Sequence, residues 1–376
     1  NCYIHGGSAG IYLAGNGENI LIQNNNIKNV DNYGIYMYYN NFTEISNNSI
    51  EQRYNTNLTL IDFTAMYFYQ SNGNFIRNNK IHLYQTYYGM YMYYASKLDY
   101  SHLLVYNNEI IAPVTNNYYG IYMSTGCSDV KLLHNSVLIK GKGMGRCLYV
   151  TTTLSGNVLR NNNFINLSGD VSSIDNHVVY FPTTTATAGY TMDYNNYYTT
   201  GAYLGYAGNN ITNLTLWRTA VGQDANSTSI NPTFFSSQTL DIVDYTGLSC
   251  PRISDVPIDI DSNNRTANTT VGAYHGDPYA LDVMPRAIVS PAPVSSIGAV
   301  TPVTVTVLNV GSDTVTQMRV HWVVNGITQP SYTWTGILLP NTTTSPITLG
   351  SFYPQPGYNS IIVYTSMPNG QADNLP

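Results

Sequence analysis

The stretch Gly34-Ile35-Tyr36-Met37-Tyr38, followed about a dozen residues later by Asn47-Asn48-Ser49-Ile50, decides the fold because both halves recur along the chain. The other first halves are Gly10-Ile11-Tyr12, Ala65-Met66-Tyr67, Gly89-Met90-Tyr91, Gly120-Ile121-Tyr122, Cys147-Leu148-Tyr149 and Val178-Val179-Tyr180. The other second halves begin at Asn24, Asn78, Asn107, His134, Asn161 and Asn195. Successive first halves start 24, 31, 24, 31, 27 and 31 residues apart. Such a repeat indicates a solenoid, in which each coil buries its apolar side by stacking on its neighbours.

The apolar positions of the repeat alternate, which predicts strands rather than helices. Ile35 and Met37 share one face, whereas Tyr36 and Tyr38 share the other. Stacking the repeats in register gives two wholly apolar inward columns. They are Ile11, Ile35, Met66, Met90, Ile121, Leu148 and Val179, and Leu13, Met37, Phe68, Met92, Met123, Val150 and Phe181. The Asn pairs are expected at bends, where Asn tolerates a left-handed backbone and stacked side chains form hydrogen-bonded ladders.

These repeats resemble those of right-handed parallel β-helices, the architecture of pectate-lyase-like proteins, over roughly residues 1–200. The resemblance implies an all-β solenoid but says little about activity, since one fold hosts many functions. A leucine-rich solenoid is the alternative, but its Leu-x-x-Leu-x-Leu phrase is absent.

A capping region is predicted over about 200–280, which completes a β-helix domain spanning 1–280. It contains one helix, with Asn213 as N-cap, Leu214, Trp217 and Val221 on one face, and Gly222 at its end. We expect this helix to cover the open end of the solenoid, where strand edges would otherwise be unpaired. The segments 230–235, 259–265 and 271–274 resemble the closing segments of large secreted β-helix proteins of Bacteroidetes-type bacteria.

A second domain is predicted over 281–376. Strands are expected at 303–308, 318–324, 347–349 and 360–365, with a hairpin at Asn325-Gly326. Their spacing suggests an immunoglobulin-like sandwich. The phrases at 308–311, 336–340 and 368–373 are similar to the CARDB type of adhesion-related module. That resemblance implies a spacer in an extracellular or cell-surface bacterial protein, exported by the type IX route.

Charged residues make up only 10% of the 376 residues, the net charge is −6, and no basic run occurs, so nucleic acid is not an expected partner. No apolar stretch approaches the roughly 20 residues that span a membrane. The cysteines Cys2, Cys127, Cys147 and Cys250 lack metal-ligand spacing, and their pairing stays open. The chain starts within a repeat, and we expect it to be a piece of a longer polypeptide.

The resemblance to pectate-lyase-like proteins implies an enzyme alternative, because that group includes both polysaccharide lyases and glycoside hydrolases. Acidic residues are scattered through the coils without a shared position, although glycosidases need two carboxylates across a cleft. The nearest cluster is Arg77, Lys80 and His82, with Glu109 on the next coil. It is either a site for an acidic sugar or, as we favour, an exposed strand with solvated charges.

Asp259-x-Asp261-x-Asn263 resembles the start of a calcium loop. The later Gly is missing, and Thr270 stands where a bidentate Glu would be needed. A hydrogen-bonded turn is therefore the favoured interpretation, with calcium as the alternative. No other cofactor is expected.

The outward tyrosines are the main candidate site. One column contains Tyr12, Tyr36, Tyr67, Tyr91, Tyr122, Tyr149 and Tyr180, and a second contains Tyr38, Tyr69 and Tyr93. This face stabilises the strands, contacts a protein or stacks sugar rings. We expect a structural and adhesive role in which Tyr36, Tyr38, Tyr67, Tyr69, Tyr91, Tyr93 and Tyr122 bind a partner protein or a glycan, with Arg77 and Lys80 as adjuncts. The face is also a candidate for self-association into a filament, and a carbohydrate-active enzyme is the alternative.

Overall fold

The computed structural model divides the chain into two compact units, Asn1–Gly276 and Asp277–Pro376. It describes residues 1–52, 63–84, 88–114, 118–141, 143–151, 154–168, 176–236, 238–243, 245, 247–276, 281–292, 298–309, 311, 313–339 and 342–371. Each unit has its own apolar core, so the two are treated separately.

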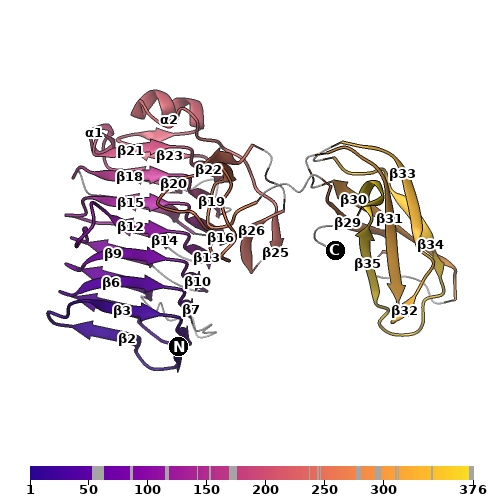
Figure 1. The fold of residues 1–376 in the computed structure, drawn as a ribbon, viewed down its shortest axis with the longest axis horizontal. Helices are drawn as coiled ribbons and strands as arrows, with labels where there is room; N and C mark the ends of the chain where they lie inside the picture. Colours follow the sequence, from indigo (N-terminus) through magenta and orange to yellow (C-terminus); the bar gives the residue numbers. More distant parts are fainter. Residues whose placement is uncertain are drawn as a thin grey trace. The chain divides into compact units, whose positions relative to one another are not determined.

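The first unit is a parallel β-solenoid whose strands form three sheets along its length (Figure 1). Sheet 1 contains β2 (Ala9–Ala14), β5 (Tyr33–Tyr38), β8 (Thr64–Tyr69), β11 (Tyr88–Tyr93), β14 (Tyr118–Met123), β17 (Gly145–Val150), β20 (His177–Phe181), β23 (Gly205–Ala207) and the antiparallel β24 (Asn210–Ile211). Sheet 2 contains β3 (Ile20–Gln23), β6 (Asn41–Ser46), β9 (Asn72–Arg77), β12 (Leu103–Tyr106), β15 (Val130–Leu133), β18 (Asn157–Arg160) and β21 (Tyr190–Asp193). Sheet 3 contains β1 (Tyr3–His5), β4 (Asn26–Lys28), β7 (Ser49–Glu51), β10 (Lys80–His82), β13 (Glu109–Val114), β16 (Ser136–Gly141), β19 (Asn163–Ser168) and β22 (Asn196–Thr199).

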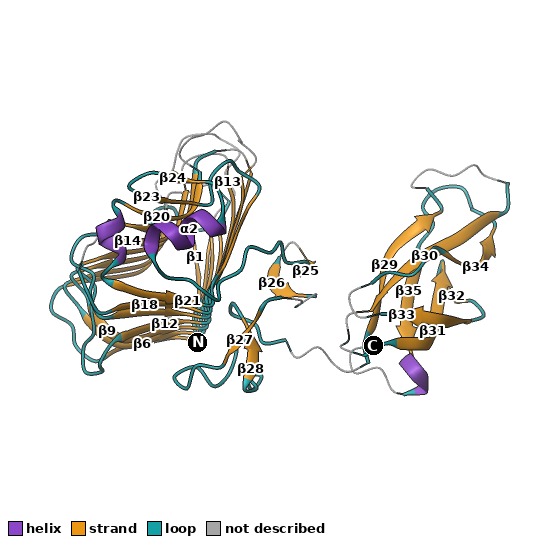
Figure 2. Cartoon of the chain, turned by 90° about the horizontal axis from the view of Figure 1, so that it is seen from above, coloured by secondary structure: helices purple, strands orange, loops and turns teal. Residues whose placement is uncertain are grey.

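The predicted inward columns form the core of the solenoid. Ile35, Met66, Met90, Ile121 and Leu148 are paired in register and completely buried. The second column is likewise buried from Met37 onward. Seen along the solenoid, the strands of each sheet superimpose (Figure 2). The alternation of apolar and tyrosine residues therefore predicted the register correctly.

The Asn pairs lie at the corner between sheets 2 and 3, as the sequence predicted. The first residue of each pair is left-handed, for example Asn78 with φ 55° and Asn161 with φ 58°. The second residue belongs to a ladder in which each amide nitrogen donates to the carbonyl oxygen of the next side chain, at 2.9–3.0 Å. The ladder members are Asn25, Asn48, Asn79, Asn108, Asn135, Asn162 and Asn195.

One predicted register position is wrong. Asn195 was aligned with the first residue of each pair, but it is the last ladder member, and Tyr194 takes the left-handed position with φ 56°. Because a Tyr precedes Asn195, the Asn-Asn pattern does not identify this corner in the sequence, although the backbone of Tyr194 adopts the same bend as the Asn residues.

The predicted helix is α2 (Leu214–Val221), and it lies over the last coil (Figure 1). The Asn213 side chain accepts a hydrogen bond from the Leu216 amide, and Gly222 ends the helix in the left-handed conformation with φ 68°. Trp217 is fully buried against the solenoid core, and its indole N–H donates to Asp224 at 2.8 Å. A shorter helix, α1 (Thr184–Thr187), precedes it.

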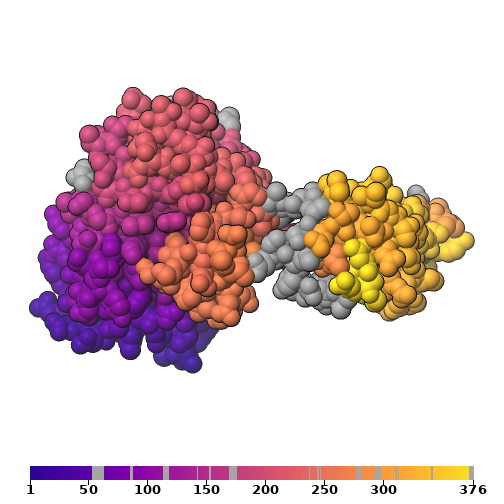
Figure 3. Space-filling model, turned by 45° about the horizontal axis from the view of Figure 1, so that its top comes forward, coloured from indigo at the N-terminus to yellow at the C-terminus, as the bar shows by residue number. Residues whose placement is uncertain are grey.

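The rest of the predicted capping region does not lie over the end. Residues 230–276, called the strap below, run back along the side of the coils, where Figure 3 shows them in orange. The strap contains β25 (Phe234–Ser236), β26 (Thr239–Ile242), β27 (Ser249–Pro251) and β28 (Asn268–Thr270). Its apolar residues pack on the outer faces of sheets 2 and 3.

The second unit consists of two small antiparallel sheets around one core. The first contains β29 (Val283–Ser290), β30 (Thr301–Asn309) and β34 (Ile347–Phe352). The second contains β31 (Val315–Val324), β32 (Ile327–Thr328), β33 (Tyr332–Leu338) and β35 (Ile361–Ser366), and the short helix η1 (Pro368–Gly370) follows. Asn325 and Gly326 both have positive φ and connect β31 to β32, which confirms the predicted hairpin.

Candidate functional site: the tyrosine face

The outward face of sheet 1 carries the predicted tyrosine columns. The central column is paired in register from Tyr12 through Tyr180. Tyr206, on one further coil, extends the column. The repeat phrase fades after residue 198, so the sequence pattern does not predict Tyr206. Tyr38, Tyr69 and Tyr93 are paired as the second column. We call this surface the tyrosine face.

Rings of the central column stand nearly parallel to one another. The centroid of Tyr36 lies 4.4 Å from that of Tyr12 and 5.0 Å from that of Tyr67, with interplanar angles of 2° and 1°. Tyr67 and Tyr91 are also 5.0 Å apart and stacked. From Tyr122 the rings tilt, with 84° between Tyr91 and Tyr122. From Tyr12 to Tyr91 the rings therefore cover one another's faces.

A third group of tyrosines lies on the same face and was not predicted. Tyr33, Tyr88 and Tyr119 contact the central column, with 4.8 Å between the ring centroids of Tyr33 and Tyr36. They precede the Gly of each repeat, so strict alternation would place them inside.

The reason for this placement is a local break in alternation at the glycine. A Cβ added at Gly34 would lie 2.5 Å from the Ala65 carbonyl oxygen and 2.7 Å from Ile50 Cγ2. Gly34 and Ile35 therefore both face inward, and Tyr33 is turned out. The close approach of two backbones explains a preference for small residues here. The recurring sequence Tyr-Gly-Ile-Tyr is the signal from which this third group of outward tyrosines could have been predicted.

Burial and the neighbouring Tyr12 raise the pKa of Tyr36 to about 12. Burial likewise raises the pKa of Tyr149 to about 12. These phenols remain protonated at physiological pH, so they present neutral O–H groups that donate and accept hydrogen bonds. The tyrosine face therefore presents rings and neutral hydroxyls, and Arg146 of β17 lies among them, 4.8 Å from the ring centroids of Tyr149 and Tyr180.

The structure does not bring Arg77 and Lys80 to this face, which corrects the prediction that they assist it. Arg77 is on sheet 2 and forms an ion pair with Glu44 at 2.7 Å. Lys80 is on sheet 3 and forms an ion pair with Asp261 of the strap at 3.0 Å. Arg77 and Lys80 are separated only by the pair Asn78-Asn79. They lie on opposite sides of the corner because the chain turns at that pair.

Glu109 anchors the strap. Its carboxylate is 1% exposed and accepts hydrogen bonds from the Tyr274 hydroxyl at 2.6 Å and the Leu240 amide at 2.7 Å. His82 Nε2 lies 3.0 Å from the same carboxylate. Burial acts to raise the pKa of Glu109, but hydrogen bonds from His82, Tyr274 and Leu240 outweigh it and hold the pKa below its usual value of 4.5.

This arrangement predicts that acid loosens the strap. Because the folded-state pKa of Glu109 is lowered, its contribution is complete above about pH 4.5 and is lost as the pH falls through the lowered value. Glu109→Gln should weaken strap attachment by about 2 kcal/mol at neutral pH and flatten this acid response. The strength of strap attachment and its acid response are measured by hydrogen exchange of the strap between about pH 6 and pH 3. Glu51→Gln, in a partly exposed pair with Lys28, is the control. An unchanged acid response in Glu109→Gln would contradict the assignment.

The calcium candidates form a hydrogen-bonded turn. The Asp259 carboxylate accepts hydrogen bonds from the amides of Asp261, Asn263 and His275 at 2.7–2.9 Å, and from the Asn263 side chain at 3.1 Å. Asp261 pairs with Lys80. Within the described ranges, no group of three His, Cys, Asp or Glu side chains is placed to hold a metal ion.

None of the four cysteines, all of which lie in described segments, forms a disulfide; Cys2 is exposed and Cys127, Cys147 and Cys250 are buried. Cys147 occupies the inward position that Gly120 holds in the preceding coil, and it is completely buried in the solenoid core. In the described part of the chain, no helix has the length and apolar character needed to cross a bilayer.

Comparison with known proteins supports the fold. Residues 1–164 match the family model described as a right handed beta helix region, which is less than half of the chain. Together with the three parallel sheets, this match identifies the solenoid as a right-handed β-helix. Neither a curated protein nor a solved structure matches the chain.

Proposed function

We propose that the β-helix is a structural and adhesive module that binds another protein through the tyrosine face. In this proposal the chain belongs to a large extracellular protein on the surface of a Bacteroidetes-type bacterium, exported by the type IX route. The second unit is then an immunoglobulin-like spacer of the CARDB type, an assignment that its two antiparallel sheets and its sequence phrases support.

The single observation that carries the proposal is that the strap covers sheets 2 and 3 but leaves the aromatic surface of sheet 1 uncovered. The strap's apolar contacts go to Ile111, Leu138 and Ile165 of sheet 3 and to Leu104 and Leu133 of sheet 2. Rings of the tyrosine face stay partly exposed, and Tyr12 is 59% exposed. Tyrosine is enriched at protein interfaces, and aromatic surfaces of this extent usually have a partner.

Ring geometry favours a protein over a glycan as the partner. A sugar stacks its C–H face on an open aromatic face, but here Tyr36 and Tyr67 cover each other's faces at 1° between their planes. Outward edges and hydroxyl groups suit the mixed apolar and polar contacts of a protein surface. A second copy of this chain is one such protein, and its lateral association would build a filament.

The carbohydrate-active enzyme alternative is a glycoside hydrolase, which requires two carboxylates across a cleft, or a polysaccharide lyase, which requires a base and usually a cation. Two acidic residues of the coils are instead held by neighbouring side chains: Glu44 forms an ion pair with Arg77, and Glu109 lies 3.0 Å from His82 Nε2. The enzyme alternative would be favoured if the full chain degraded an acidic polysaccharide.

Binding of the labelled full chain to cell-surface extracts tests the proposal. Treating the extract with protease should abolish binding, whereas periodate, which destroys glycans, should not. Joint replacement of Tyr36, Tyr67 and Tyr91 by Ser should weaken binding at least about tenfold, because interface aromatics supply much of the binding free energy.

Two further variants separate binding from stability. Joint replacement of the same tyrosines by Phe keeps the ring stack and tests the hydroxyl groups alone. Tyr358→Ser changes a fully exposed tyrosine of the second unit and should bind as the unchanged chain does. Binding that resists protease but is lost after periodate would replace the protein partner by a glycan. Equal binding by the Ser variant would reject the tyrosine face.

A further inference from the structure

The corner between sheets 1 and 2 carries two tyrosines that belong to neither column of the tyrosine face. Tyr39 and Tyr94 directly follow β5 and β11, and Gln70 directly follows β8 on the coil between them. The backbone amide of each of these residues donates to a carbonyl oxygen of the next coil, at 2.8–3.0 Å. The three residues therefore occupy one equivalent position on successive coils.

The backbone at this position is left-handed, with φ 55° at Tyr39, 45° at Gln70 and 50° at Tyr94. In the first coil the equivalent residue is Gly15, which also has positive φ and whose amide donates to the Tyr38 carbonyl oxygen at 3.1 Å. Bulky side chains disfavour this backbone conformation, whereas glycine adopts it freely. The bend itself therefore gives no reason for a tyrosine.

The ring of Tyr39 has an open face. Tyr38 and Tyr69 of the second column are stacked with their centroids 4.7 Å apart. The Tyr39 centroid lies 4.4 Å from that of Tyr38 and 5.7 Å from that of Tyr69, and its plane is inclined at 87° and 67° to theirs. A ring so close to both and so steeply inclined lies beside the stack, with one face on the ring edges. Its opposite face points away from the stack, and Tyr39 is 41% exposed.

Tyr94 lies in the same way two coils further along. Its ring centroid is 4.7 Å from that of Tyr93 at an interplanar angle of 70°, and the residue is 42% exposed. Gly126 of the next coil leaves room for this ring, since a Cβ there would lie 2.1 Å from Tyr94 Cδ1. Two coil spacings, about 9.6 Å, separate Tyr39 from Tyr94 along the solenoid.

Neutral amide side chains accompany the two rings. Gln70 lies on the coil between them and is partly exposed. Asn41 and Asn72 begin β6 and β9 on the sheet 2 side of the corner, are paired in register and are also partly exposed. The corner thus offers open aromatic faces beside uncharged hydrogen-bonding groups, whereas the stacked rings of the central column cover one another.

From this geometry we propose that the corner binds an extended neutral glucan of the cellulose type, with one sugar ring on Tyr39 and another on Tyr94. The C–H face of a pyranose ring packs on an open aromatic face, and its hydroxyl groups, which project sideways, bond the amides of Gln70, Asn41 and Asn72. In such a glucan every second ring recurs at a distance close to two coil spacings. This site lies beside the tyrosine face and is separate from the proposed protein contact. Because it has no charged group, we expect millimolar affinity, which a washed binding assay on cell-surface extract does not detect.

Titration of the full chain with cellohexaose, maltohexaose and glucose, followed by saturation-transfer nuclear magnetic resonance, tests this site. Cellohexaose should bind at least about tenfold more tightly than glucose, because its second ring contact forms within an already bound molecule. Maltohexaose has the same composition but a curved chain, which prevents contact with both tyrosines, and should bind no better than glucose.

Tyr39→Gly and Tyr94→Gly separate binding from folding. Each removes a ring and introduces the residue that best suits positive φ, so thermal melting should be preserved. Cellohexaose affinity should fall about tenfold in each variant, whereas Tyr39→Phe keeps the ring face and should bind as the unchanged chain does. Tyr358→Gly, at a fully exposed tyrosine of the second unit, is the matched control. Absence of cellohexaose binding, equal affinity for maltohexaose, or unchanged affinity in both corner glycine variants would overturn the proposal.

Discussion

Asn135→Ala should lower the free energy of unfolding of the β-helix by about 4 kcal/mol, because it opens the ladder in its middle. The side-chain oxygen Oδ1 of Asn135 accepts hydrogen bonds from the backbone amide and the side-chain amide of Asn108, at 3.1 and 2.9 Å. Its own amide donates to the Val105 carbonyl at 2.9 Å and to Asn162 at 3.0 Å. All of these groups are buried, so each lost partner leaves a polar atom without water.

Chemical denaturation followed by far-ultraviolet circular dichroism measures this effect. Asn209→Ala is the matched control, since Asn209 is exposed at a turn and should change stability by less than about 0.5 kcal/mol. Similar losses in both variants would mean that the ladder adds no more than an ordinary surface amide.

Arg265→Met should release the strap while leaving the coils folded, with a cost of about 4 kcal/mol to strap attachment. The guanidinium is 1% exposed and donates to Asn107 Oδ1 at 2.9 Å and to the carbonyls of Gly272 and Ala273 at 2.9 and 3.0 Å. Burial lowers the pKa of Arg265 to about 10, so it remains charged at neutral pH. Methionine fills similar space but leaves these acceptors unpaired.

Hydrogen exchange resolved by peptide is the measurement, with the loss of protection expected in 248–276 and not in the sheets. Limited proteolysis should cut the strap earlier than in the unchanged chain. Arg286→Met, exposed on the second unit, should behave as the unchanged chain. If hydrogen-exchange protection of the strap is unchanged in Arg265→Met, the apolar contacts of the strap suffice to hold it on the coils and the prediction is wrong.

Elements controlled by local pattern were predictable from the sequence. Ile35 and Tyr36 point to opposite faces because side chains alternate along a regular strand, and repetition fixes their columns. The helix ends at Asn213 and Gly222 follow from capping rules that act within one turn. The Tyr33 group escaped prediction because Gly34 breaks the alternation on which the columns were built.

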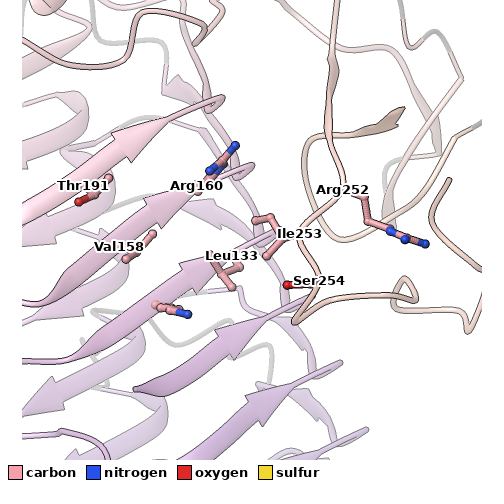
Figure 4. Close-up of a pocket in the computed structure, with 8 residues that line it drawn as sticks. Leu133, Val158, Arg160, Thr191, Arg252, Ile253 and Ser254 are labelled. Atoms are coloured by element: carbon pink, nitrogen blue, oxygen red, sulfur yellow. The ribbon is translucent and has the colours of Figure 1, made fainter. Parts of the chain in front are cut away.

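Contacts between distant segments were not predictable in the same way. Glu109 and Lys80 looked like solvated charges, but each bonds a strap residue more than 100 positions away. Arg265 carried no local signal of burial, since its acceptors are mostly backbone carbonyls. Leu133 of sheet 2 and Ile253 of the strap likewise line one pocket only because the strap folds back (Figure 4).

The corner ladder has a consequence for how such a molecule changes in length. Every rung is built the same way from the rung before it, so duplicating or deleting one whole unit should extend or shorten the rod by about 4.8 Å and leave the other rungs intact. Inserting a single residue into a strand should be far more harmful, since it exchanges the inner and outer side chains of that strand. Evolution of this architecture is thus expected to proceed by whole-unit steps.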